Sequence, residues 1–573
     1  MSIRDKDRRF FVSLTHVLLA ISVTLGMVGY LYLLPFDEAE GAGQTILMLT
    51  DAAYATARLF ILEGPDDLAT DGSTLALWLV GVARLLAPIA LAGYAVTVSE
   101  RLWRPLMTGL QARRLSDHYV IFGWDAYATE LARDLRADNV PMAIMLPPED
   151  DAEAVRRALG SDVVVMSGDI YDRRSWQRIR MMSARAIVVF ASDLELLRIV
   201  ETFREFEPTR FDKDIDPDTP TRVFLRVSSR QLKRQLIVRQ GLFASSKRFR
   251  FEPFNVEELS ARTFFHERHL FLDAKTAGHP GLHWVFVGWS DSLSALSEQL
   301  VKVSPFPGLQ VPRLTVFSRE PHRTRAQLGD VLGPVQGYIR WSVHEWAEGG
   351  TLPPLNEMRI AAEKSPLTGV FLASGEAADL TRALALESAM DQERVSRAPI
   401  WIERAHESEI AETLSRAGVE SAPRRPVLTA TMLLGSLDRA ARAFHEAYTT
   451  YANQSEAWED LDENFRNANR RAADHAKTKL EALGLAEKVN SAIPEADLRK
   501  LVEANLEPLA RVEHDSWSID RQLNGWQYGP ERSDTARLHP SLIPYDDLDQ
   551  YQKDLDRWQV EQLPKIVGVK DHG

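Results

Sequence analysis

The residue types best suited to binding a small molecule lie near the end of this 573-residue chain. Indole and phenol rings can stack on a planar base, and arginine side chains can donate paired hydrogen bonds to phosphate or carboxylate oxygens. The stretch 514–548 combines both kinds of group around a glycine-rich turn. These types predict a nucleotide-like ligand, although the aromatic residues could instead close a small helical core. The candidate ligand-binding residues are Trp517, Arg521, Trp526, Tyr528, Arg532, His539 and Tyr545.

These residues form an ordered pattern. A histidine and a tryptophan precede Gly-Trp-x-Tyr-Gly at 525–529, and His-Pro-x-Leu-x-Pro-Tyr follows at 539–545. The pattern resembles the RyR domain, the repeat found in ryanodine receptors and in many bacterial proteins. An earlier, partial copy adds His445, Tyr448 and Arg470 as candidates. The resemblance implies a mainly α-helical domain over 430–567, built from half-repeats at 440–484 and 505–567, with a cleft between them.

Upstream of this region, short apolar runs alternate with helical stretches, which is typical of a parallel sheet covered by helices on both faces. The sequence "HYVIFGWDAYATELARDL" opens the first such region, and "HWVFVGWSDSLSALSEQL" opens a second. The chain therefore carries an internal duplication. We expect two Rossmann-like α/β domains, at 117–275 and 280–425.

The first α/β region resembles the RCK, or TrkA-N, family over about residues 117–240. The resemblance rests on the glycine after the first strand, on "SGDIYDRRSW" and on "ARAIVVFAS". A dinucleotide site needs Gly-x-Gly-x-x-Gly so that the backbone can approach the pyrophosphate, but an aspartate that would repel a diphosphate replaces the second glycine. NAD is therefore disfavoured, and the cofactor stays unidentified, with a nucleotide as the candidate. The candidate cofactor-binding residues are Gly123, Asp125, Asp169 and Gly288.

Two apolar runs lie near the N-terminus, at about 11–35 and 75–98, and each approaches the ~20 residues that cross a bilayer as a helix. Lysine and arginine residues precede the first run and arginine residues follow the second, whereas the stretch 37–71 between the runs carries Arg58 as its one basic residue. The positive-inside rule then predicts that both termini are cytoplasmic. We expect a multi-pass inner-membrane protein with a cytoplasmic segment 1–10, a two-span hairpin 11–99 and a linker 100–116. A pair of buried core helices is the alternative.

Three residues of this hairpin are candidates for a role inside the membrane: Glu63, Arg84 and Pro88. A charge near the middle of a span costs at least ~2.5 kcal/mol unless it faces protein or water, so Arg84 should line a cavity or pair with Glu63 or Asp51. Pro88 should kink the helix and free a carbonyl group. The order of span, amphipathic segment and span resembles the pore of two-span cation channels. No Thr-x-Gly-Tyr-Gly filter follows the segment, and a plain membrane anchor is the alternative.

Composition excludes several classes of function. The chain has no cysteine, which excludes disulfides, thiolate metal sites and cysteine nucleophiles. Its net charge of -13 argues against nucleic-acid binding, because phosphate backbones attract basic surfaces. The zinc motif His-Glu-x-x-His, the nucleophile elbow Gly-x-Ser-x-Gly and the Walker A loop do not occur. We therefore expect neither an enzyme nor a metal site.

The sequence thus predicts a multi-domain membrane protein with two transmembrane helices, two Rossmann-like domains and a helical RyR domain. Tandem RCK-like domains behind two spans resemble the gating rings of potassium channels, which implies a ligand-gated ion channel of the cation or potassium type, or a transport regulator, assembled as a homotetramer. Two alternatives remain open. One is a nucleotide-activated membrane effector of bacterial stress or antiphage defence, and the other is a membrane-tethered NAD-binding enzyme.

Overall fold

The chain forms two compact units, Met1–Arg114 and Leu115–Gly573. Glu63 lies outside the described residues, so its predicted role is not tested. The computed structural model describes residues 3–34, 41–61, 73–160, 163–205, 220–238, 248–346, 352–373, 376–392, 398–402, 419–420, 428–434, 438–453, 455–458, 460–485 and 493–567.

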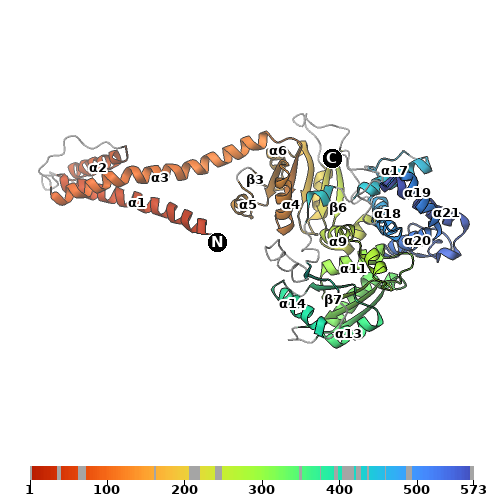
Figure 1. Ribbon diagram of the computed structural model, residues 1–573. Coiled ribbons are helices and arrows are strands. Elements are labelled where there is room, and N and C mark those ends of the chain that lie inside the picture. The colour runs from red at the N-terminus through yellow and green to blue at the C-terminus, as the bar shows by residue number, and fades with distance from the viewer. Residues whose placement is uncertain are drawn as a thin grey trace. The chain divides into compact units, whose positions relative to one another are not determined.

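The N-terminal unit contains α1 (Ile3–Leu33), α2 (Ala42–Arg58) with the 3-10 turn η2 (Leu59–Ile61), and α3 (Thr74–Arg113). Helices α1 and α3 pack along each other, with α2 beside them (Figure 1). The windows Leu14–Leu33 and Thr74–Ala95 are long and apolar enough to cross a membrane. Only 28% and 22% of these windows is buried, which argues against core helices of a soluble domain. Helix α3 continues through Pro88 and most of the predicted linker, which is therefore largely helical.

The first sheet of the larger unit has six parallel strands in the order β3-β2-β1-β4-β5-β6. This is the strand order of a Rossmann fold, because the crossover helices place successive strands outward from β1 in both directions. Its strands are β1 (His118–Phe122), β2 (Met142–Leu146), β3 (Val164–Ser167), β4 (Ala184–Val189), β5 (Thr221–Arg226) and β6 (Phe249–Phe254). Its helices are α4 (Ala126–Ala137), α5 (Ala152–Leu159), α6 (Arg173–Arg178), α7 (Leu196–Arg204) and α8 (Arg230–Val238), with the 3-10 turn η3 (Met181–Ser183).

The second sheet repeats this topology in the order β12-β11-β10-β7-β8-β9. A buried histidine begins the first strand of each sheet: the Nε2 of His118 lies 2.9 Å from the carbonyl oxygen of Ile179, and the Nδ1 of His283 lies 2.7 Å from that of Ser365. The duplication read from the sequence therefore extends to the fold. The strands are β7 (His283–Gly288), β8 (Arg313–Ser318), β9 (Arg340–Glu345), β10 (Gly369–Ala373), β11 (Ile400–Ile402) and β12 (Val419–Glu420). The helices are α11 (Asp291–Val303), α12 (Pro321–Leu332), α13 (Leu355–Lys364) and α14 (Glu376–Gln392), with the turn η4 (Gly333–Val335).

Helices that connect the sheets interlock the two α/β domains. Helix α9 (Val256–His266), with α10 (Leu270–Thr276), follows β6 of the first sheet but packs on the second. The ring of Phe264 lies 6.1 Å from that of Trp284 and 5.8 Å from that of Phe371. After the second sheet, α16 (Ala430–Leu434) returns to the core of the first domain, where the Ala430 N–H donates to the carboxylate of Asp134 at 2.7 Å. The second core therefore depends on a helix from the first domain.

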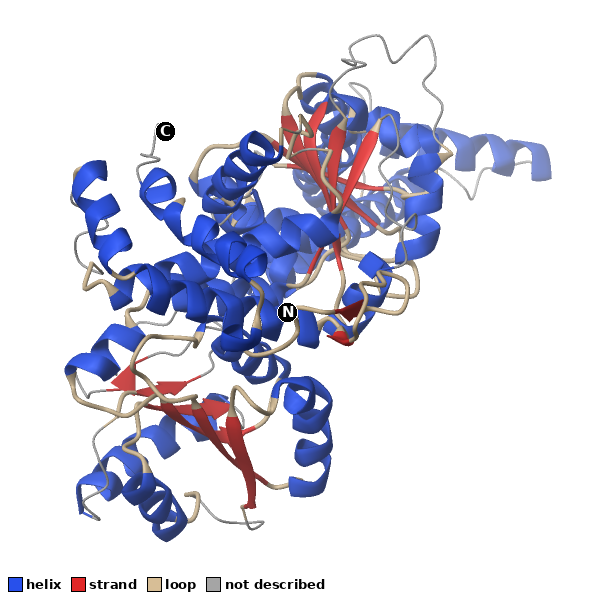
Figure 2. Cartoon of the chain, turned by 90° about the vertical axis from the view of Figure 1, so that its right-hand side faces the viewer, coloured by secondary structure: helices blue, strands red, loops and turns tan. Residues whose placement is uncertain are grey.

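The C-terminal region is helical and packs on α9 and α11 (Figure 1). Figure 2 shows the two sheets separately, with helices between them. Helix α17 packs on α18, and α20 packs on α21. The two pairs meet where α18 packs on α20 and where Tyr451 of α17 lies against Trp558 of α21, with ring centres 4.6 Å apart. The elements are α17 (Arg439–Ala452), α18 (Glu463–Ala482), α19 (Glu495–Ala504), α20 (Leu506–Leu523), the short strands β13 (Gln527–Tyr528) and β14 (Leu538–His539), the turn η5 (Tyr545–Asp547), α21 (Gln550–Glu561) and α22 (Leu563–Val567).

Candidate ligand-binding site

A polar cavity of about 260 Å³ lies where the helical domain meets both α/β domains. Its wall combines residues of β6, α8 and α9, of α11, and of α18, α20 and the loop after α20. Four of the ligand-binding residues predicted from the sequence line this one cavity: Arg470, Arg521, Trp526 and Arg532. The contact between α18 and α20 brings Arg470 to the same space as the other three.

Arg521, in the last turn of α20, is the residue of this wall with unmet hydrogen-bonding capacity. Its guanidinium carbon lies 5.7 Å from the ring centre of Trp517 and 5.3 Å from that of Trp526, so both indoles hold it by cation–π contact. Its Nε is buried and has no hydrogen-bond partner among the described residues. Burial lowers the pKa of Arg521, and the positive charges of Arg471 and Arg532 act in the same direction. An anion placed here would relieve each of these costs.

The turn after α20 adds two more arginines to the same end of the cavity. Arg537 has left-handed backbone geometry (φ 53°) and donates from Nη1 to the Asn524 carbonyl at 2.6 Å. Arg532 is exposed and pairs with Asp534 at 2.8 Å. Arg537 was missed from the sequence, since a lone arginine in a loop carries no signal until the turn folds.

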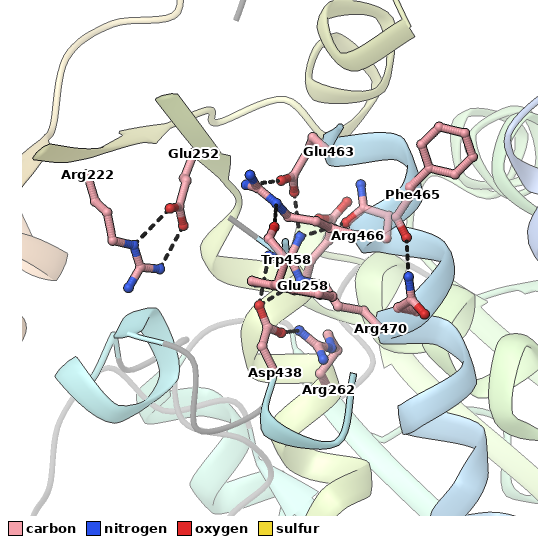
Figure 3. Close-up of polar contacts among 12 residues, drawn as sticks. Arg222, Glu252, Glu258, Arg262, Asp438, Trp458, Glu463, Phe465, Arg466 and Arg470 are labelled. Atoms are coloured by element: carbon pink, nitrogen blue, oxygen red, sulfur yellow. Dashed lines mark hydrogen bonds and ion pairs between the residues drawn. The ribbon is translucent and has the colours of Figure 1, made fainter. Parts of the chain in front are cut away.

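The other charged groups of the wall are mostly paired with one another. Arg470 binds Asp438 at 2.7 Å and also Glu463, and Asp438 in turn accepts a bond from Arg262 at 3.3 Å (Figure 3). Although burial alone would raise it, Arg470 and Arg262 hold the pKa of Asp438 well below its usual range. Arg470 is thus a saturated part of the wall, and an incoming anion would find its free donors at the Arg521 end.

Glu298 of α11 organises another part of the wall. Its carboxylate pairs with Arg230 at 2.9 Å, with Lys302 at 2.8 Å and with Arg234. Burial would raise the pKa of Glu298, but these three cations hold it well below the usual range. The network joins α8 of the first domain to α11 of the second, so the cavity wall crosses the boundary between the domains.

A buried charge cluster behind the cavity fixes α18 against α20. The Glu513 carboxylate accepts a bond from Arg471 at 2.8 Å and another from Lys479. Glu513 and Lys479 are 0% exposed, so neither charge can be compensated by water. The sequence patterns gave no indication of this cluster, because its members lie on separate helices.

The remaining predicted ligand-binding residues do not line the cavity. Trp517 lies behind Arg521, and the ring of His539 lies 4.9 Å from that of Trp517 and 6.1 Å from that of Trp526. Burial, with Arg532 and Arg521, lowers the pKa of His539 to about 4. Consistent with a neutral ring, the Nδ1 of His539 accepts the Ser541 N–H at 3.1 Å.

Four more of the predicted residues are placed in packing or on the surface. Tyr545 is buried and donates to the Glu507 carboxylate at 3.1 Å, and the Nε2 of His445 lies 2.8 Å from the Glu456 carbonyl oxygen. Both rings therefore lie in helical packing. Tyr448, beside Trp558, and Tyr528 are exposed.

Two of the predicted cofactor residues of the first sheet, Gly123 and Asp125, belong to the turn after β1, where a carboxylate of the protein already binds the N-terminus of α4. Gly123 has φ 77°, and a Cβ there would lie 2.1 Å from the Phe190 carbonyl oxygen. The Asp125 carboxylate caps α4 by accepting the Ala128 N–H at 2.8 Å, and it pairs with Arg226 at 2.8 Å. A protein carboxylate therefore stands at the helix N-terminus, where a dinucleotide phosphate would lie.

The other two predicted cofactor residues do not complete that site. Asp169, after β3, is exposed and accepts the Tyr171 N–H at 2.8 Å. Gly288 belongs to the second sheet, where Ser290 caps α11 through the Leu293 N–H at 3.1 Å. The four predicted residues thus divide between two sheets.

Arg84 is exposed on α3, and among the described residues it has no hydrogen bond or ion pair. Asp51 of α2, its proposed partner, is also exposed and forms no ion pair with it. Pro88 lies within the same helix and is half-buried.

Comparison with known proteins identifies two domains. Residues 119–219 match the TrkA-N domain model and residues 493–569 match the RyR domain model. Similar solved structures include GsuK bound to ADP (14% identity, 74% of this chain and 95% of that chain, TM-score 0.34) and the GsuK channel bound to NAD (13% identity, 74% and 82%, TM-score 0.35). Another GsuK channel structure has 14% identity, covers 72% and 93%, and has a TM-score of 0.36. The chain therefore contains a TrkA-N domain that is followed, after a second Rossmann-like domain, by a RyR domain.

Proposed function

We propose that this chain is a membrane-anchored sensor whose cavity binds an anionic, nucleotide-like molecule. Binding controls the two-span N-terminal unit as a ligand-gated ion channel or as a regulator of transport. The observation that carries the proposal is Arg521, a guanidinium held between two indoles at the wall of a cavity, with a buried Nε that has no partner among the described residues.

The chemistry of the wall selects the class of ligand. Trp526 offers an aromatic side chain to a planar base, while Arg521, Arg532 and Arg537 offer donors to phosphate oxygens. A volume of about 260 Å³ suits a compact ligand rather than a macromolecule. The first Rossmann turn is the less favourable site for the same ligand, because Asp125 would repel its phosphates.

Binding rather than catalysis is the proposed activity. The described lining residues include no histidine, serine or cysteine, and most of the lining carboxylates are committed to ion pairs. The wall is shared by three domains, so a ligand that fits one arrangement of these domains better than another shifts the population toward it. An inner-membrane location with cytoplasmic termini and a homo-oligomeric assembly complete the proposal.

A thermal-shift screen of the detergent-solubilised full chain tests this proposal. The panel contains inorganic phosphate, pyrophosphate, AMP, ADP, ATP, NAD and cyclic dinucleotides. At 100 times the Kd, a ligand specific for the folded state stabilises it by about 2.7 kcal/mol. We expect at least one nucleotide to raise the melting temperature more than phosphate or pyrophosphate does.

Trp526→Ala should remove the gain from that nucleotide, whereas the control Tyr551→Ala, at a side chain 66% exposed on α21, should keep it. If no compound of the panel stabilises the wild-type chain, the proposed sensor is wrong. The same conclusion follows if Trp526→Ala retains the full response.

A further inference from the structure

Helix α3 carries two parallel stripes of side chains, each with the alternating spacing of three and four residues that keeps one face of a helix in register. The first stripe is buried or half-buried and packs against α1, where Gly29 lies directly against Ala76 and Val80. It consists of Ala76, Val80, Ala83, Ala87 and Ala90. The second stripe consists of Leu77, Gly81, Arg84, Pro88, Leu91 and Ala95.

The second stripe has no partner in the described part of the N-terminal unit. Leu77 and Leu91 are 43% and 40% exposed, and Gly81, Arg84 and Ala95 are also exposed. A Cβ added at Gly81 would meet no atom within 4 Å. Small residues at this spacing allow two helix backbones to approach closely in a membrane.

Two polar groups near the middle of this stripe, the guanidinium and the carbonyl group of Arg84, require protein or water around them. Arg84 is near the centre of the apolar window Thr74–Ala95, where a charge facing lipid is strongly unfavourable. Pro88 has no N–H, so the carbonyl group of Arg84 lacks its usual donor one turn later. Lipid satisfies neither group, whereas protein or water can satisfy both.

We propose that further copies of this chain occupy the second stripe and that the resulting oligomer surrounds a water-filled lumen lined by Arg84. Guanidinium groups from adjacent copies would repel one another in a dry interface, so water and counter-ions must lie between them. A ring of arginine attracts anions and excludes cations, so the lumen passes small inorganic anions such as chloride. This inference rests on the proposed function, because it requires the N-terminal unit to lie in a bilayer.

Single-cysteine crosslinking in native membranes tests the interface, since the chain has no cysteine of its own. Leu77→Cys and Leu91→Cys should each form disulfide-linked dimers under mild oxidation. Val17→Cys, on the exposed surface of α1 and 49% exposed, is the matched control and should crosslink much less. Equal crosslinking at all three positions, or none on the stripe, would overturn the interface.

Current recordings test the ion. The full chain is reconstituted in planar bilayers under a KCl gradient, with each nucleotide of the thermal-shift panel added in turn. We expect the reversal potential of the wild type to lie close to the equilibrium potential of chloride. Arg84→Gln should lose this anion selectivity, and Arg84→Glu should shift the reversal potential toward the equilibrium potential of potassium. Arg113→Gln, outside the apolar window, should keep the wild-type reversal potential.

Potassium selectivity of the wild type, unchanged selectivity in Arg84→Gln, or no current under any condition would overturn the inference. Crosslinking of Leu77→Cys in the Arg84→Gln background shows whether that variant still assembles. The two proposals can fail separately: a nucleotide-dependent melting shift without anion current refutes the lumen and leaves the sensor intact.

Discussion

Replacement of Arg521 by methionine separates a ligand-binding arginine from a structural one. Methionine keeps an unbranched, apolar stem between the indoles of Trp517 and Trp526 but removes the charge and the buried Nε. If Arg521 exists to bind an anion, the free protein should tolerate the change and the bound state should not.

The expected magnitudes follow from these contacts. Two cation–π contacts of about 0.5–1 kcal/mol each are lost, and sulfur–aromatic contacts restore roughly 0.3–1.5 kcal/mol. Removing a buried donor without a partner returns about 1–3 kcal/mol. The free energy of unfolding of Arg521→Met should therefore fall by no more than about 1 kcal/mol relative to the wild type, and over most of this range it rises. Loss of one charged hydrogen bond to the ligand, about 1.5–3 kcal/mol, should weaken affinity by roughly 10-fold to more than 100-fold.

Both quantities can be measured on the same preparations. Urea denaturation of the solubilised chain gives the change in stability, and isothermal titration with the nucleotide found in the thermal-shift screen gives the change in affinity. Arg511→Met is the control, because Arg511 pairs with Asp546 at 2.6 Å on the surface and does not line the cavity. It should leave affinity unchanged and cost at most about 1 kcal/mol of stability.

The refuting result is the opposite pattern. If Arg521→Met lowers the unfolding free energy by more than about 2 kcal/mol while nucleotide affinity is unchanged, Arg521 is a packing residue and the cavity has lost its main anion donor.

Three further predictions concern stability and are measured by chemical denaturation. Glu513→Gln should cost about 3–5 kcal/mol, because it leaves Lys479 and a neighbouring arginine buried without their anion; a loss below about 1 kcal/mol would contradict that account. Gly123→Ala should destabilise by more than the ~1 kcal/mol typical of a substitution, because the new Cβ would collide with the Phe190 carbonyl at φ 77°; wild-type stability would show that the turn relaxes. Because the folded state lowers the pKa of His539 to about 4, below the ~6.5 of the unfolded chain, the free energy of unfolding should fall as the pH drops from about 6.5 to 4. His539→Asn, which keeps an acceptor, should reduce this pH dependence. If the pH dependence of stability is the same in the variant, it does not arise from His539.

Local patterns in the sequence were sufficient for the fold class, two Rossmann-like domains with parallel sheets, but the strands β6, β9 and β12 were not identified from them. An apolar strand, a glycine and an amphipathic helix occur twice, and each occurrence begins a sheet with the same strand order. A parallel sheet buried on both faces imposes continuous apolar runs, so this signal survives in a single sequence. The RyR-like turn was recognisable for a similar reason, since glycine, tryptophan and proline occupy fixed positions around it.

The composition of the site depended on tertiary contacts that no local pattern encodes. Arg470 reaches the cavity because α18 packs on α20, yet its guanidinium already forms ion pairs with Asp438 and Glu463. Tyr545 and His445 have the residue types of ligand contacts but are buried in helical packing. Residue type thus predicts what a side chain could bind, whereas its neighbours decide whether any donor is left to do so.

Helix α9 has a consequence for how this chain can be divided. Asn255 alone separates β6 from α9, and its amide donates to the carbonyls of Val227 and Ser228 at 3.0 Å while its oxygen accepts the Glu258 N–H at 3.0 Å. A fragment that ended at residue 275 would expose the aromatic side chains of α9 to solvent, and a fragment that began at 280 would lack part of its own interior. The two duplicated α/β domains therefore cannot fold independently of each other. Truncation or recombination between them should yield insoluble products rather than separate folded domains.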